Sequence, residues 1–326
     1  MTALIDRFNR KIEYLRLSVT DRCDFRCFYC IPKGFKGFTE VEDRLKLDEF
    51  IRLIRVFSEM GVSKVRLTGG EPLIHKDIEV MVRGIAALPD IEDFSMSTNA
   101  SHLAQHARML KDTGVGRINV SLDSLNPEVF RRITQGDLIK VIDGLMEAKR
   151  VDLYPIKINM VVMRDLNLHE VGDMVDFCIK NRFTLRFIET MPVGAAGQEA
   201  RDLYVPMDEV RQILEQRFKL EPARMKGAGP AKYFKIADKR IKIGFITPMS
   251  QHFCEDCNRV RLSSEGTLYL CLGQQDKLEL KPLLRRGLSD DQLKDEILAA
   301  IQRKPEKHEF NTNPDQVVRV MSMTGG

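Results

Sequence analysis

Three cysteines lie close together near the start of the chain, in the segment TDRCDFRCFYCIPKG at residues 20–34. Their spacing is C-x3-C-x2-C, formed by Cys23, Cys27 and Cys30. Closed zinc sites and closed iron–sulfur clusters usually take four protein ligands. Three thiolates can instead hold three irons of a [4Fe–4S] cluster and leave the fourth iron open to a substrate or cofactor. The alternative is a zinc site that takes its fourth ligand from a distant residue.

A second set of three cysteines lies in HFCEDCNRVRLSSEGTLYLC, near the other end of the chain. Its spacing is C-x2-C-x13-C, formed by Cys254, Cys257 and Cys271. Because His252 precedes Cys254, a Cys3His zinc site explains this set alone as well as an iron–sulfur cluster does. We favour a second [4Fe–4S] cluster because this set repeats the incomplete ligand count of the first.

The composition limits the class of protein. The chain has 326 residues, is 43% hydrophobic and carries a net charge of +4, which allows a sizeable core and gives no case for nucleic-acid binding. No apolar run is long enough for a transmembrane helix, and the first residues lack the apolar core of a secretory signal. We therefore expect a cytoplasmic protein without a membrane partner, in which clustered cysteines bind metal. Cys178, among apolar residues at helical spacing, is expected to be a buried structural thiol.

Apolar, β-branched runs alternate with amphipathic stretches over the first 190 residues. Strands are expected at 14–20, 63–68, 94–99, 116–122, 156–163 and 184–190. Helices are expected at 47–61, 75–88, 101–113, 137–150 and 168–182. Six βα units predict an α/β fold, an incomplete (β/α)6 TIM-like barrel that is open because a closed barrel needs eight.

Polar residues follow the ends of these strands, where barrel enzymes place their active sites. They are Asp21 and Arg22, GGEP at 69–72, Asn99, LDS at 122–124 and ETMP at 189–192. The pattern changes after about residue 195, where short strands and helices mix. We therefore expect two domains: 1–194, a partial barrel with the first cysteine set, and 195–326, an α+β extension with the second set that covers the open side.

The motif C-x3-C-x-aromatic-C after the first strand, with TGGEP after the second, resembles the radical S-adenosylmethionine superfamily. In that superfamily three cysteines hold a [4Fe–4S] cluster whose open iron binds S-adenosylmethionine, and reductive cleavage gives a 5′-deoxyadenosyl radical. Further segments occur in one order: INVSLDS, IKINMVV, RFIETMPVG, CNRVRL and a terminal Gly-Gly. Together they resemble the GTP 3′,8-cyclase family over essentially the whole chain.

This resemblance implies a lyase of molybdenum cofactor biosynthesis that converts GTP to (8S)-3′,8-cyclo-7,8-dihydroguanosine 5′-triphosphate. The radical would take the hydrogen from C3′ of GTP. The implied metal ligands are Cys23, Cys27 and Cys30 for the first cluster and Cys254, Cys257 and Cys271 for the second. The implied S-adenosylmethionine contacts are Tyr29, Gly70, Ser121 and Met191, to which we add Glu71 because a carboxylate can accept from the cofactor's amino group. The implied GTP contacts are Arg16, Arg66, Ser97, Lys157, Arg259, Val260 and Arg261.

The charges of the implied GTP contacts suit a triphosphate, because arginine offers fork-shaped, charge-assisted donors. Lys64 and Arg186 are further candidates. Strand alternation alone leaves open whether these side chains face the barrel interior or solvent. Gly325 and Gly326 would reach into the active site and assist catalysis, whereas chain physics alone favours a frayed end.

The resemblance also implies an electron donor and a functional partner, cyclic pyranopterin monophosphate synthase, and it allows a homodimer. Two other functions stay open on the residues alone. One is another radical S-adenosylmethionine enzyme with an auxiliary cluster, such as a peptide-modifying maturase, and the other is a zinc-stabilised binding protein. Cyclisation of GTP separates the first from a cyclase, and metal content separates the second.

Overall fold

The computed structural model describes residues 3–38, 40, 42, 44–225, 229–251 and 253–325. In this part of the chain twelve strands form one sheet, in the order β12-β11-β10-β1-β2-β3-β4-β5-β6-β9-β8-β7. The strands are β1 (Tyr14–Ser18), β2 (Lys64–Thr68), β3 (Asp93–Thr98), β4 (Arg117–Ser121), β5 (Ile156–Val161), β6 (Thr184–Ile188), β7 (Leu220–Ala223), β8 (Lys232–Ile236), β9 (Lys242–Ile246), β10 (Arg259–Leu262), β11 (Thr267–Tyr269) and β12 (Lys277–Glu279).

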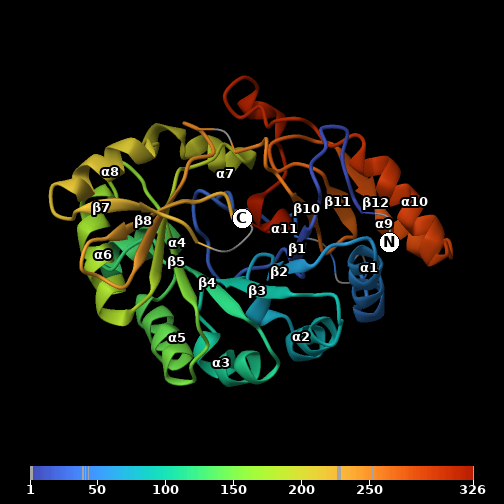
Figure 1. Cartoon of the computed structure of the whole chain (residues 1–326), viewed down its shortest axis with the longest axis horizontal. Helices are drawn as coiled ribbons and strands as arrows, with labels where there is room; N and C mark the ends of the chain where they lie inside the picture. Colours follow the sequence, from blue (N-terminus) through green and yellow to red (C-terminus); the bar gives the residue numbers. More distant parts are fainter. Residues whose placement is uncertain are drawn as a thin grey trace.

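Helices follow most of the first six strands and cover the outside of the sheet (Figure 1). The α-helices are α1 (Leu47–Glu59), α2 (Ile78–Ala86), α3 (Leu103–Asp112), α4 (Pro127–Thr134), α5 (Leu138–Arg150), α6 (Val171–Asn181), α7 (Gly194–Glu199), α8 (Met207–Glu215), α9 (Leu280–Arg285), α10 (Asp290–Ile301) and α11 (Met321–Thr324). Short 3-10 turns are η2 (Pro72–Ile74), η3 (Leu168–Glu170), η4 (Arg201–Leu203) and η5 (Pro314–Gln316). Among the described residues, no helix combines the length and apolarity that crossing a membrane would need.

The expected partial barrel is confirmed, because β1 to β6 are parallel neighbours in chain order. The C-terminal segment also adds strands to the barrel wall, which the sequence did not predict. Its strand β10 pairs in parallel with β1, and its strand β9 pairs in parallel with β6. The extension therefore lengthens the barrel wall at both edges and brings the second cysteine set next to the first strand.

Helix α4 was not expected from the sequence, although its start carries two local signals. Asn126 caps it, accepting hydrogen bonds from the backbone N–H groups of Glu128 and Val129, and Pro127 occupies the first turn. Strands β7 and β12 were also missed. Each is only three or four residues long, which is too short to show alternation.

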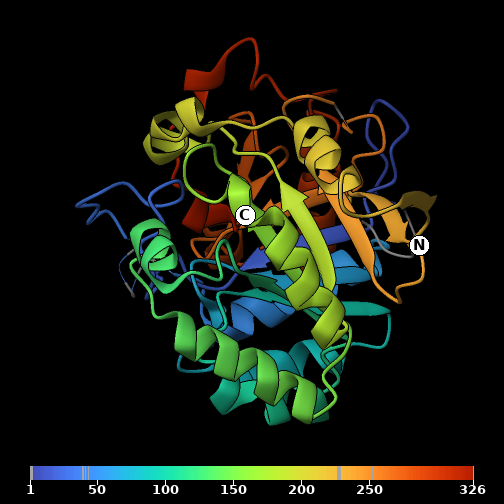
Figure 2. The same cartoon turned by 90° about the vertical axis from the view of Figure 1, so that its left-hand side faces the viewer.

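The end of the chain runs back into the barrel. Helix α11 lies against β1, and Figure 1 shows it beside β1 and β10; Figure 2 gives the same fold from its side. Met321 packs with Val193, Phe310 and Val317 in a small apolar cluster that anchors this segment. The described tail is therefore part of the packed interior.

Candidate active site

The strand register places the candidate cations on one face. Laterally paired residues of parallel strands project to the same side of the sheet. Arg16 pairs with Arg261 on β10 and with Arg66 on β2, and Arg66 pairs with Ser95 on β3. Leu15, which points the other way, is buried in the core. The row Arg261–Arg16–Arg66 therefore faces the barrel interior.

Other candidates share this face. Ser97 pairs with Asn119 and Asn119 with Lys157, while Arg186 pairs with Asn159. Arg186 also donates to Oδ1 of Asn119 at 2.5 Å. These residues come from four neighbouring strands, so the interior row of cations continues across the barrel to β6.

Two of the strand candidates have different surroundings. Val260 points away from the interior, pairs with Leu15 and is fully buried in the core, so its side chain is not available to a substrate. This corrects the expectation for Val260. Lys64 forms an ion pair with Glu13 at 2.7 Å and keeps partial exposure, so its charge already has a partner.

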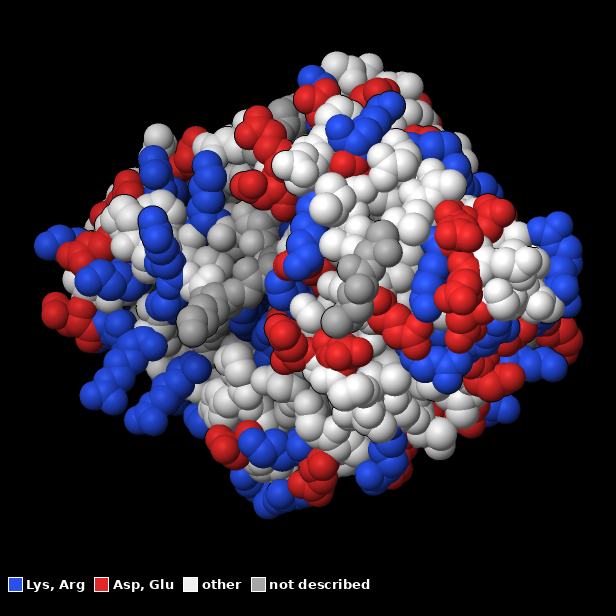
Figure 3. All heavy atoms as spheres, turned by 45° about the vertical axis from the view of Figure 1, so that its right-hand side comes forward, with Lys and Arg blue, Asp and Glu red and all other residues white. Residues whose placement is uncertain are grey.

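A cavity opens inside the barrel. In the space-filling view the surface is hollowed near its centre, with Lys and Arg side chains along part of the wall (Figure 3). The cavity lining includes Tyr14, Arg16, Arg66, Asn159, Arg186, Met191, Cys254, Cys257, Arg259, Arg261, Cys271, Lys304 and His308. The second cysteine set thus shares one chamber with most of the interior cations.

Four of the interior cations are strongly buried, and the described residues give them no counter-ion. Arg66, Lys157, Arg186 and Arg261 are 4 to 6% exposed, and none forms an ion pair with a carboxylate in the described part of the chain. Burial lowers the pKa of Arg66 and of Arg261 to about 9 and that of Lys157 to about 7, and the charges of neighbouring cations add to this effect. Buried charges without partners cost several kcal/mol each, so this chamber is built for a multiply charged anion.

The first cysteine loop is fixed by the glycines of TGGEP. The Gly70 N–H donates to the Thr20 carbonyl at 2.7 Å, and the Glu71 N–H donates to the Arg22 carbonyl at 2.9 Å. A Cβ on Gly70 would lie 2.0 Å from the Arg22 oxygen, so only glycine allows this approach. The loop that follows β2 therefore holds the start of the cysteine loop in place.

Tyr29 ties the other end of the cysteine loop to β4 and β5. Its hydroxyl donates to Oδ2 of Asp123 at 2.7 Å, and Oδ1 of the same carboxylate accepts from the Val161 N–H at 2.9 Å. Burial raises the pKa of Asp123 to about 6. The anchoring role of Asp123 was not foreseen, although its place after a strand was noted.

Burial raises the pKa of all three thiols in the first set, that of Cys30 to about 12. A metal group must therefore displace their protons when it binds. Within the described ranges no three His, Cys, Asp or Glu side chains are grouped as a site for a single metal ion. Three half-buried thiols in one loop match the donor count of an iron–sulfur cluster with one open iron.

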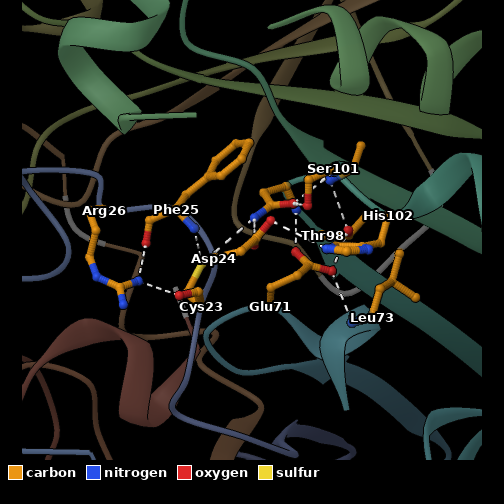
Figure 4. Close-up of polar contacts among 11 residues, drawn as sticks. Cys23, Asp24, Phe25, Arg26, Glu71, Leu73, Thr98, Ser101 and His102 are labelled. Atoms are coloured by element: carbon orange, nitrogen blue, oxygen red, sulfur yellow. Dashed lines mark hydrogen bonds and ion pairs between the residues drawn. The ribbon is translucent and has the colours of Figure 1, made fainter. Parts of the chain in front are cut away.

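Polar groups surround Cys23 (Figure 4). Asn99 donates to Oδ1 of Asp24 at 2.8 Å and approaches the Cys23 Sγ at 3.7 Å. His102 lies 3.6 Å from the same Asp24 carboxylate, and Arg26 donates to the Cys23 carbonyl. Asn99 was noted as a strand-end residue, whereas the sequence gave no signal for the other two contacts.

Glu71 has a structural role that corrects its expected one. Its carboxylate is fully buried and accepts from the Thr98 hydroxyl at 2.7 Å and from the N–H groups of Asn99 and Leu73 (Figure 4). Burial raises its pKa to about 7. These donors occupy three of the roughly four acceptor positions of a carboxylate, so it links the ends of β2 and β3, and we assign only the Glu71 main chain to a cofactor.

The second cysteine set is held by two buried arginines. Arg10 donates to the Cys254 carbonyl at 2.8 Å, and Arg319 donates to the Cys271 carbonyl at 2.9 Å. Burial opposes ionisation of Cys257, but Lys304 and Arg259 outweigh it and lower its pKa to about 7. His252, the zinc alternative's ligand, lies outside the described residues.

The described tail occupies the barrel near both loops. Thr324 is fully buried, and the Ser322 main chain forms a hydrogen bond with Cys30. Gly325 has φ +67°, and a Cβ there would lie 2.1 Å from Cγ2 of Thr68. The frayed-end alternative is therefore wrong as far as Gly325, while Gly326 lies outside the described residues. Of the remaining expected contacts, Ser121 is exposed at the end of β4.

Comparisons with known proteins find relatives over the whole chain. A family model described as Radical SAM superfamily matches residues 17–178, and one described as Molybdenum Cofactor Synthesis C matches residues 183–310. The GTP 3′,8-cyclase of Hydrogenovibrio crunogenus is 46% identical over 99% of this chain and 100% of that protein. GTP 3′,8-cyclase 1 of Pseudomonas aeruginosa is 45% identical over the full length of both. Streptococcus suis SuiB bound to S-adenosylmethionine has the same fold, with a TM-score of 0.63 and 17% identity over 91% of this chain and 69% of SuiB.

Proposed function

The chain belongs to the GTP 3′,8-cyclase family, and from that premise we propose that its barrel binds GTP and cyclises it as an early step of molybdenum cofactor biosynthesis. The observation that carries the substrate assignment is the interior row of Arg261, Arg16 and Arg66, in which Arg66 and Arg261 are buried and Arg16 is half-buried, and which has no described carboxylate partner. A triphosphate supplies the several negative charges that this row requires.

Cys23, Cys27 and Cys30 would hold a [4Fe–4S] cluster whose open iron binds S-adenosylmethionine. When bound, these groups would supply a 5′-deoxyadenosyl radical to take the C3′ hydrogen of GTP; formation of the C3′–C8 bond, followed by uptake of one electron from the reductant and one proton, would then give (8S)-3′,8-cyclo-7,8-dihydroguanosine 5′-triphosphate. The chain itself would position the reacting groups and exclude water. Gly70 and Tyr29 fix the cysteine loop, and the packed barrel keeps water from the reacting atoms.

The cofactor and substrate contacts are proposed residue by residue. S-adenosylmethionine would meet Tyr29, Gly70, Ser121, Met191 and the main chain of Glu71. GTP would meet the cations Arg16, Arg66, Lys157, Arg186, Arg259 and Arg261, with Ser97 offering a hydroxyl on the same face. Their shared interior orientation supports this division, because the cations lie on one wall and the cysteine loop caps the strand ends.

We also propose a second [4Fe–4S] cluster on Cys254, Cys257 and Cys271. Its support is threefold: all three thiols line the GTP chamber, their count again leaves one iron open, and nearby cations favour the Cys257 thiolate. The open iron would then contact the guanine. A zinc site is the alternative, and metal content decides between them.

Several further parts of the proposal follow from the family. Residues 1–194 would act as the radical domain and 195–326 as the substrate-side domain, with Gly325 and Gly326 assisting catalysis. A one-electron donor would reduce the first cluster, and cyclic pyranopterin monophosphate synthase would take up the product. We keep a cytoplasmic location and a homodimer as parts of this proposal.

The test is anaerobic incubation of the iron-reconstituted protein with GTP, S-adenosylmethionine and dithionite. We expect 5′-deoxyadenosine together with the cyclised nucleotide, and about eight iron and eight sulfide per chain, four for each cluster. Absence of both products from protein with full metal content would refute the function. Zinc without sulfide in the second set would refute the second cluster alone.

A further inference from the structure

One hydroxyl in the GTP chamber has no assigned role. Tyr14 begins β1 and lies two residues before Arg16, so both side chains face the interior. It pairs laterally with Arg259 on β10 and with Lys64 on β2, and it lines the cavity. Tyr14 therefore forms part of the chamber wall at the end opposite the first cysteine loop.

The Tyr14 hydroxyl is buried without a partner. The side chain is 1% exposed, and its oxygen makes no hydrogen bond within the described ranges of the chain. No other tyrosine hydroxyl described by the structure is in this condition. Tyr29, for comparison, donates to Asp123 at 2.7 Å. Buried polar groups are normally satisfied, so an unpaired hydroxyl in a cavity wall indicates a ligand group that completes it.

The surroundings define what that ligand group must be. The guanidinium carbons of Arg66 and Arg259 lie 5.4 and 5.7 Å from the Tyr14 ring centroid. Guanidinium groups have only donors, so neither can accept the phenolic proton. Burial opposes ionisation of Tyr14, but the field of Arg66, Arg16 and Arg259 outweighs it and lowers its pKa, which strengthens the hydroxyl as a donor. The missing partner is an acceptor that cations also attract.

We propose that Tyr14 is a positioning residue whose hydroxyl donates a hydrogen bond to a phosphate oxygen of the GTP triphosphate. This inference rests on the proposed function, because it assumes that GTP fills the chamber. Arg66 and Arg259 hold the triphosphate by charge, and Tyr14 adds a directed donor between them. A hydrogen bond to a charged group is stronger than one to a neutral acceptor, so its loss weakens triphosphate binding by about tenfold or more.

The test uses Tyr14→Phe, which removes one oxygen atom and keeps the ring against the two arginines. The holoenzyme is assayed anaerobically for kcat and KM with GTP, and for inhibition by guanosine, which lacks the phosphates. We expect KM for GTP to rise about tenfold while kcat stays within about threefold, and the inhibition constant of guanosine to stay within about twofold. Tyr154→Phe is the matched control, because the Tyr154 hydroxyl donates to the Asn181 carbonyl away from the chamber. Its loss should change neither the KM and kcat for GTP nor the inhibition constant of guanosine.

Each outcome decides the inference. An unchanged KM for GTP in Tyr14→Phe overturns it and shows that water satisfies the hydroxyl. An equal loss of guanosine and GTP affinity also overturns it, because the hydroxyl would then contact the base or ribose. A wild-type protein that neither binds nor cyclises GTP overturns the proposed function itself, whereas normal wild-type turnover with an unaffected variant overturns only the role of Tyr14.

Discussion

Gly325→Ala tests the role of the C-terminal tail by adding a single methyl group. The residue has φ +67°, a left-handed conformation that costs a non-glycine residue about 1–2 kcal/mol. The new Cβ would lie 2.1 Å from Cγ2 and 2.6 Å from Oγ1 of Thr68, far inside normal contact distance. Thr68 is 3% exposed on β2, so it has no space into which to retreat. The tail must therefore move out of its place.

The size of the effect follows from two terms. Overpacking a close-packed interior costs about 1–3 kcal/mol, and the backbone conformation adds about 1–2 kcal/mol. Their sum of about 2–5 kcal/mol lowers the equilibrium constant for tail docking by about 30-fold to several thousandfold, at 1.36 kcal/mol per factor of ten. If the docked tail assists the reaction, we expect cyclisation to slow at least tenfold, with the metal content unchanged.

The assay compares the cyclised nucleotide, 5′-deoxyadenosine and iron in matched anaerobic samples. Gly287→Ala is the control, because Gly287 also has a positive φ of +81° but an added Cβ meets nothing within 4 Å. That variant should lose a little stability and keep full activity. Cyclisation by Gly325→Ala within about twofold of the wild-type rate would refute the reasoning that docking of the tail supports the chemistry.

Three further changes test the metal sites and the cation row. Cys27→Ala should remove about four iron per chain and abolish cleavage of S-adenosylmethionine; the matched variant Cys178→Ala, at a buried thiol of α6, should keep both. Cys271→Ala should spare S-adenosylmethionine cleavage but reduce GTP cyclisation at least tenfold, and normal cyclisation would contradict its ligand role. Burial, Arg186 and other cations lower the pKa of Lys157 to about 7, so GTP binding must restore its proton above that pH. Calorimetry should therefore show GTP affinity falling about fivefold more between pH 7 and pH 8 in wild type than in Lys157→Arg, and equal pH dependence would contradict this.

The barrel strands could be predicted because each combines β-branched residues with a polar residue at its end. The strands that pair with the two edges of this barrel, β10 and β9, could not be predicted as its neighbours. The pairing of β1 with β10 joins Tyr14 to Arg259, residues at opposite ends of the chain, and a parallel ladder leaves no local turn signal between its strands. The extension therefore looked like a cover over the open side, whereas its strands continue the wall.

The cysteine spacing predicted both sulfur sets, because the donor count is a local property of the sequence. The local sequence does not determine which way the side chains of Arg16, Arg66 and Lys157 point, because this depends on which face of the sheet turns inward. Tyr14 was missed for a related reason: an aromatic residue at the start of a strand fits ordinary β propensity. Its position two residues before Arg16 was the available signal, and it becomes informative only once the register places Arg16 inside.

The interior row of cations is hard to explain by folding stability alone. Arg261, Arg16 and Arg66 stand side by side on adjacent strands, where like charges opposite one another destabilise a sheet by about 0.2–1 kcal/mol per pair. Burial adds a larger desolvation penalty for Arg66 and Arg261. Closed barrels fill the same positions with layers of branched apolar side chains, which carry no such cost. A polyanion that binds only the folded chain offsets both terms, by about 2.7 kcal/mol when its concentration is 100 times its Kd. In the proposed function the substrate would therefore complete the barrel wall electrostatically, and the same row that weakens the empty fold would select a triphosphate over an uncharged nucleoside.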